Sequence, residues 1–100
     1  MKAGQGGAAM KVEATSITNA NAGELLAEGS AAIARGDFAI DLGSVTDVDS
    51  AAVALLLEWQ RQAMARGGRL VLGGVPADIA SLARLYGVDG LLDLGEHAGS

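Results

Sequence analysis

The chain lacks cysteine, contains a single proline, and has only three aromatic residues among its 100. The absence of cysteine excludes disulfides, thiolate metal sites and cysteine nucleophiles, and it is typical of a reducing compartment such as the cytoplasm. Half of the residues are nevertheless hydrophobic. The core must therefore be built mainly from Leu, Val, Ile and Ala, with Phe38, Trp59 and Tyr86 as its only aromatic candidates.

Long apolar runs and clusters of positive charge are also missing. No run approaches the roughly 20 apolar residues that cross a bilayer, and residues 1–10 lack the apolar centre of a secretory signal. Seven Lys and Arg are scattered among twelve Asp and Glu, which gives a net charge of −5, whereas proteins that bind nucleic acid cluster their cations. We therefore expect a cytoplasmic protein that neither inserts into a membrane nor binds nucleic acid.

The length and the order of the predicted elements indicate one α/β domain. Residues 1–9 and 96–100 are expected to be tails, and residues 10–95 the folded domain. Periodicity and turn residues predict strands at 10–15, 38–42 and 69–74, and helices at 22–35, 50–66 and 77–86. The segment 91–94 either adds a last short strand or covers the core. Because one helix separates successive strands, right-handed crossovers place them side by side in a small, mixed or parallel β-sheet packed with α-helices.

The helix at 50–66 has a clear apolar face, which lets its buried side chains be predicted. Residues at i, i+3, i+4 and i+7 spacing form a stripe that consists of Ala52, Val53, Leu56, Trp59, Gln60 and Ala63. The opposite face carries Glu58, Arg61 and Gln62. The amide of Gln60 must find hydrogen-bond partners within the stripe, since an unpaired buried amide costs roughly 1–3 kcal/mol. Leu55 lies about 100° from the centre of this stripe, and we expect it to leave apolar surface exposed near the helix start. In the last helix, the predicted buried stripe is Ile79, Leu82, Ala83 and Tyr86.

The turn before this helix holds the residues that could carry chemistry. Asp41, Asp47 and Asp49 stand close in sequence, as paired carboxylates of a hydrolase would. Acidic residues before a helix start also accept hydrogen bonds from free backbone N–H groups and face the positive end of the helix dipole. The capping interpretation is favoured, because the only histidine, His97, lies near the C-terminus and no nucleophile–base pair is evident. We expect no catalysis, no cofactor and no metal.

Ser50 admits two interpretations. A hydroxyl at a helix start is commonly a cap, and it is also where an added phosphate would meet free N–H groups. Capping is favoured by the frequency of serine at such positions. A docking surface at this helix start would explain both Ser50 and an exposed Leu55.

Several motifs resemble a known family when they are taken in order. They are D-x-D-S before an apolar helix, at Asp47–Ser50, and S-L-A-R-L-Y-G-V at residues 81–88. From about Met10 to Leu94 the chain resembles a STAS domain, the family that includes anti-sigma factor antagonists and a subunit of a lipid transporter. Within the family it is most similar to MlaB-type subunits of phospholipid ABC transporters.

The resemblance separates two roles. Phospho-regulated antagonists carry Asp-Ser-Ser-Gly at this turn, and their phosphorylated second serine falls on Ala51, which has no hydroxyl, while the glycine falls on Ala52. Ser50 matches the Ser or Thr that MlaB-type proteins place at the helix start, toward the ATPase subunit. Most STAS domains have two strands before the first helix, whereas this chain has room for about one, so a shorter sheet is expected.

The resemblance implies a non-enzymatic, cytoplasmic subunit that lies on an inner-membrane transporter. It would bind and regulate or stabilise the ATPase of a Mla-type phospholipid ABC transporter that maintains outer-membrane lipid asymmetry. The partner-binding residues it implies are Asp47, Asp49, Ser50, Ala51 and Leu55. The alternative is an anti-sigma factor antagonist or another partner-switching regulator, which would bind an anti-sigma kinase instead.

Overall fold

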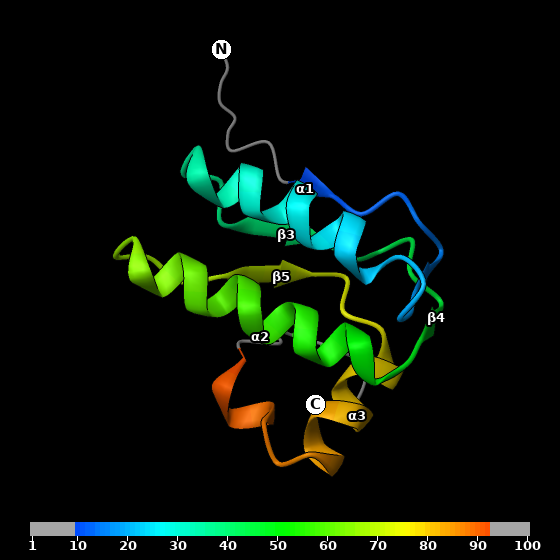
Figure 1. The fold of residues 1–100 in the computed structure, drawn as a ribbon. Helices are drawn as coiled ribbons and strands as arrows, with labels where there is room; N and C mark the ends of the chain where they lie inside the picture. Colours follow the sequence, from blue (N-terminus) through cyan, green and yellow to red (C-terminus); the bar gives the residue numbers. More distant parts are fainter. Residues whose placement is uncertain (1–9, 93–100) are drawn as a thin grey trace.

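Three short parallel strands form the sheet on which the first two helices pack (Figure 1), while the third helix packs against the second helix and a separate pair of strands. In the computed structural model, which describes residues 10–92, β1 (Met10–Lys11) and β5 (Val71–Gly73) flank β3 (Ala39–Asp41). The register aligns Met10 with Ile40 and Ile40 with Leu72. The predicted parallel neighbours are confirmed, although each strand is shorter than expected.

The segment before the first helix forms two strands and not one. After β1, the backbone N–H of Val12 still donates to Asp41 O of the central sheet, at 3.0 Å. From Thr15 onward the chain pairs with a different segment, and β2 (Ser16–Ile17) runs parallel to β4 (Asp47–Val48). The predictions of a single strand at 10–15 and of a missing strand were therefore wrong. Apolar–polar alternation does not reveal that a strand changes its partner.

The three helices agree with the predicted ranges to within one residue at each end. They are α1 (Ala22–Ala34), α2 (Ser50–Ala65) and α3 (Ala77–Leu85). A glycine with positive φ follows each of them closely, and these glycines are Gly36, Gly67 and Gly87. Glycine adopts this conformation without the steric cost that a Cβ would bring, so it ends the helices where their apolar periodicity ends.

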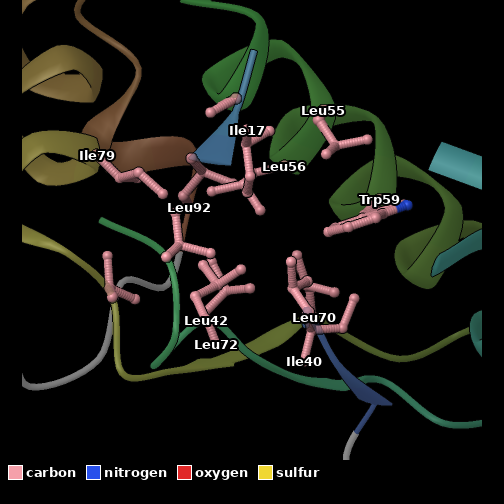
Figure 2. Packing of buried hydrophobic residues seen from close by; sticks show 14 of the residues in the cluster. Ile17, Ile40, Leu42, Leu55, Leu56, Trp59, Leu70, Leu72, Ile79 and Leu92 are labelled. Atoms are coloured by element: carbon pink, nitrogen blue, oxygen red, sulfur yellow. The ribbon is translucent and has the colours of Figure 1, made fainter. Parts of the chain in front are cut away.

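The apolar stripe of α2 packs on the sheet, as predicted. Figure 2 shows Leu56 and Trp59 pointing toward the layer of side chains formed by Ile40, Leu42, Leu70 and Leu72. The Gln60 prediction is confirmed too, because this buried amide has two partners. Its Oε1 accepts from the backbone N–H of Leu70 at 2.9 Å, and its Nε2 donates to Leu91 O at 3.2 Å.

Two predictions of exposure were wrong. Leu55 is only 5% exposed and belongs to the core. The reason is that α2 packs against α1 as well as against the sheet (Figure 1), so its buried arc is wider than one stripe. Tyr86, expected in the core, is 51% exposed, because it lies at the C-cap of α3, past the buried residues of that helix.

The chain after α3 covers the core. A short 3-10 helix, η1 (Asp89–Leu91), precedes Leu92, which is buried against the core cluster. Of the two alternatives for residues 91–94, the covering role therefore holds for Leu92, while residues 93–94 lie outside the described residues, as do the expected tails at 1–9 and 96–100.

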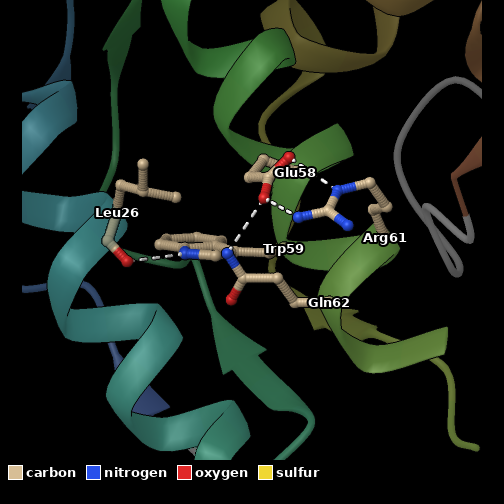
Figure 3. A network of polar contacts seen from close by, with 5 residues as sticks. All are labelled: Leu26, Glu58, Trp59, Arg61 and Gln62. Carbon is tan, nitrogen blue, oxygen red and sulfur yellow. Dashed lines mark hydrogen bonds and ion pairs between the residues drawn. The ribbon is translucent and has the colours of Figure 1, made fainter. Parts of the chain in front are cut away.

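The packing of α1 against α2 depends on a glycine. Gly29 of α1 lies against the indole of Trp59, and a Cβ built at this position would overlap the ring. The indole Nε1 also donates to Leu26 O of α1, at 3.3 Å (Figure 3). The two helices therefore meet at van der Waals distance around one aromatic ring.

We expect Gly29→Ala to lower the free energy of unfolding by roughly 1–3 kcal/mol, because the added methyl group must displace the indole. Gly23→Ala in the same helix is the matched control. Its Cβ would meet open space, so it should raise the free energy of unfolding by roughly 0.4–1 kcal/mol through the loss of unfolded-state entropy. Urea denaturation of both variants measures the difference, and stabilisation by Gly29→Ala would contradict the described contact.

Candidate functional site

A groove of about 460 Å³ lies between the first turns of α1 and α2. The two helices begin at the same end of the domain (Figure 1), where the parallel strands end. The residues that line the groove come from α1, from α2 and from the turns before them: Asn19, Ala22, Gly23, Leu26, Asp49, Ser50, Ala51, Ala54, Leu55 and Glu58.

The groove exists because small residues face each other across the helix pair. Gly23 on α1 and Ala51 and Ala54 on α2 leave space that larger side chains would fill. Leu26 and Leu55, which are partly and almost fully buried, form its apolar floor. The site is thus a shallow apolar groove whose α2 wall carries the polar residues Asp49, Ser50 and Glu58.

Asp49 fixes the start of α2 and ties it to the turn before α1. Its extended backbone (φ −125°, ψ −170°) places the carboxylate over the helix end. Oδ1 accepts from the backbone N–H of Ala51 at 2.8 Å, and Oδ2 accepts from the backbone N–H of Asn19 at 3.3 Å. The capping role that the sequence predicts for an aspartate of this turn is confirmed at Asp49.

The capping role predicted for Ser50 was wrong. Ser50 is the first residue of α2, and within residues 10–92 its exposed side chain makes no hydrogen bond. Capping of this end is already provided by the preceding residue, whose carboxylate is the stronger acceptor for a backbone N–H. The Ser50 hydroxyl therefore points to solvent at the mouth of the groove, where an approaching group could bond to it.

The other two aspartates do not join Asp49 in a catalytic pair. Asp41 Oδ1 accepts from the backbone N–H of Gly43 at 2.8 Å and so stabilises the turn after β3. Asp47 is exposed in β4, and His97 lies outside the described residues. Within residues 10–92, no group of three or more His, Cys, Asp or Glu side chains is arranged to hold a metal ion. In the same part of the chain, no helix has the length and apolar character needed to cross a membrane.

Glu58 carries a fixed negative charge at the far end of the groove. Its carboxylate accepts from Arg61 Nε at 3.0 Å and from Gln62 Nε2 at 3.1 Å (Figure 3). The hydrogen bonds from Arg61, and then from Gln62, lower the pKa of Glu58 to about 2. Because the folded-state pKa is the lower one, this stabilising contact is present above about pH 4.5 and is lost as the pH falls toward 2.

The structure brings together four of the five predicted site residues. Asp49, Ser50, Ala51 and Leu55 line the groove, whereas Asp47 does not. Sequence reasoning missed two residues of α2, Ala54 and Glu58. It also missed the opposite wall, which consists of Asn19, Ala22, Gly23 and Leu26. Periodicity assigned Glu58 to an outer face, and no signal in the sequence shows which helices lie next to each other.

Comparison with known proteins decides the family. The family model described as "Mlab, STAS domain" matches residues 1–93. The chain belongs to the MlaB-type STAS family. Three helices on parallel strands agree with the STAS fold, so both the resemblance and the predicted fold class are confirmed. No curated protein matches the chain with significance.

In this STAS domain the two neighbouring residues at the start of α2 should contribute differently to stability. We expect Asp49→Ala to cost about 0.5–2 kcal/mol, because two backbone N–H groups lose their acceptor. Ser50→Ala should change the free energy of unfolding by less than about 0.5 kcal/mol. Denaturant melts of the two variants test this assignment, and equal losses would mean that the Ser50 hydroxyl also holds the helix start.

Proposed function

We propose that this STAS domain is a non-enzymatic subunit that binds the ATPase of a Mla-type phospholipid ABC transporter and regulates or stabilises it. The observation that carries the proposal is the exposed Ser50 hydroxyl at the mouth of an apolar groove. MlaB-type proteins place a Ser or Thr at this helix start, toward the ATPase subunit. The transporter is the kind that maintains outer-membrane lipid asymmetry, and the domain would lie on its cytoplasmic side.

The groove is suited to docking because its walls are held in place before a partner arrives. The Asp49 carboxylate joins the start of α2 to the turn at Asn19, and Trp59 joins α2 to Leu26. A preformed surface loses little conformational entropy when it binds. Leu26 and Leu55 supply the apolar area, and Ser50 supplies a directional hydrogen-bonding group.

A regulatory effect requires that the domain distinguish two states of the ATPase. A partner that binds both states equally shifts no equilibrium, however tightly it binds. We therefore propose that the groove contacts a part of the ATPase whose position differs between its states or is unstable without support. The domain's own contribution is a rigid surface, in agreement with the packed junction between α1 and α2.

The alternative is an anti-sigma factor antagonist. Phosphate transfer at the family's second serine is impossible here, because that position is Ala51. Ser50 is exposed one residue earlier, so labelling by an anti-sigma kinase has to be tested there. Stoichiometric phosphate incorporation at Ser50, with capture of such a kinase, would favour this alternative over the transporter role.

Filling the groove should weaken ATPase binding without unfolding the domain. Ala54 is an exposed residue of the groove, so Ala54→Phe places a ring over Leu26 and Leu55. We expect it to weaken binding of the purified ATPase subunit roughly tenfold or more, the loss typical when a central contact is blocked. Ala65→Phe is the matched control, since Ala65 is exposed on the same helix but lies at its other end.

Isothermal titration with the ATPase subunit, beside a thermal melt of each variant, measures both quantities. Ala65→Phe should bind like the wild type. Unchanged binding by a well-folded Ala54→Phe variant would remove the groove from the interface.

A further inference from the structure

The rim of the groove is acidic. The two ionisable residues that line it, Asp49 and Glu58, both carry negative charge. Glu24 lies in the first turn of α1, and Asp47 is exposed just before α2. Among residues 10–92, no Lys or Arg lines the groove.

The two helix N-termini at the groove carry partial positive charge, which opposes the negative charge of the carboxylates. The sign of the net charge at the groove therefore depends on which of the two is larger. Each helix N-terminus is equivalent to roughly half a positive charge, and α1 and α2 together therefore supply about one. Asp49 caps α2 and Glu24 lies in the first turn of α1, and each carries a full negative charge. The carboxylates outweigh the dipoles, so the groove attracts cations and disfavours phosphate or other anions.

Arg61, three residues after Glu58 on α2, is already bonded to the carboxylate. The guanidinium of Arg61 donates to the Glu58 carboxylate through Nε and Nη2 (Figure 3). This pair is open to solvent, with side-chain exposures of 68% for Arg61 and 35% for Glu58. The pair is accordingly weak enough for a second cation to share or replace. Arg35 and Arg66 lie at the C-caps of α1 and α2, at the other ends of the two helices.

We propose that the ATPase segment entering this groove is cationic: it places an aliphatic side chain over Leu26 and Leu55, and an Arg or Lys beside Glu58. The inference rests on the proposed function, because it names the chemistry of the segment that binds there. Arg61 competes with the incoming cation for the same carboxylate. The domain therefore recognises its partner by a hydrophobic contact and by an exchange of ion pairs at the groove's end.

Neutralising the two members of the Glu58–Arg61 pair one at a time tests the sign of the partner's charge. Glu58→Gln should weaken binding of the purified ATPase subunit roughly three- to tenfold, because the incoming cation loses its acceptor. Arg61→Gln should strengthen binding roughly two- to fivefold, because the Glu58 carboxylate loses the cation that competes with the partner. Both effects should shrink between about 0.05 M and about 0.5 M salt, as screening increases.

The matched control is the exposed ion pair between Arg35 and Asp37, whose atoms lie 3.6 Å apart. It follows α1, a helix of about 20 Å, and so lies at the end away from the groove. Arg35→Gln and Asp37→Asn change the net charge as the two test variants do. Both should change the dissociation constant less than roughly twofold, since distant surface charges are screened.

The outcomes separate this inference from the function on which it rests. If the wild-type domain does not bind the ATPase subunit, the proposed function fails and the inference fails with it. If the wild type binds but Glu58→Gln and Arg61→Gln both weaken binding, the pair has only a structural role. No change in either variant, or changes of the reverse sign, would likewise overturn the cationic segment and leave the proposed function standing.

Discussion

The contact between Gly29 and the Trp59 ring is the constraint on which the rest of the structure depends. A helix pair approaches closely only where one helix offers no side chain, and here the space is taken by an indole that also donates its N–H to Leu26 O. This contact sets the separation of α1 and α2. Toward the helix starts the same separation is no longer filled, because Gly23, Ala51 and Ala54 are small, and the groove results. The helix separation set by the Gly29–Trp59 contact therefore leaves the unfilled space between the first turns of α1 and α2.

The elements that could be predicted from the sequence are those whose signals are local. Helix α2 has an acidic cap, an apolar period and a Gly67–Gly68 stop, and its predicted range was correct to one residue. Gln60 was placed in the core by the same period. The strand pair β2–β4 could not be found in this way, because each strand has two residues and the partners lie about 30 positions apart. No residue pattern in either segment indicates that the two segments pair.

The candidate site was predicted on one side only. Residues at the start of α2 were identified through its cap and through the family motif, whereas the α1 wall depends on the packing direction of two helices. Leu55 illustrates the difference: its angle from the stripe suggested exposure, and contact with α1 buries it. Glu58 was assigned to an outer face for the same reason. A helical period describes one buried face, and a helix that packs against two neighbours has a wider one.

The double role of Asp49 limits how this surface can vary. One carboxylate caps α2, holds the turn at Asn19 and forms part of the groove wall, so any replacement that altered recognition would also loosen the helix start. Positions such as Ala54 and Glu58 have no comparable duty to the backbone. Divergence toward a new partner would therefore proceed through the second and third turns of α2, while Asp49 stayed fixed as part of the scaffold.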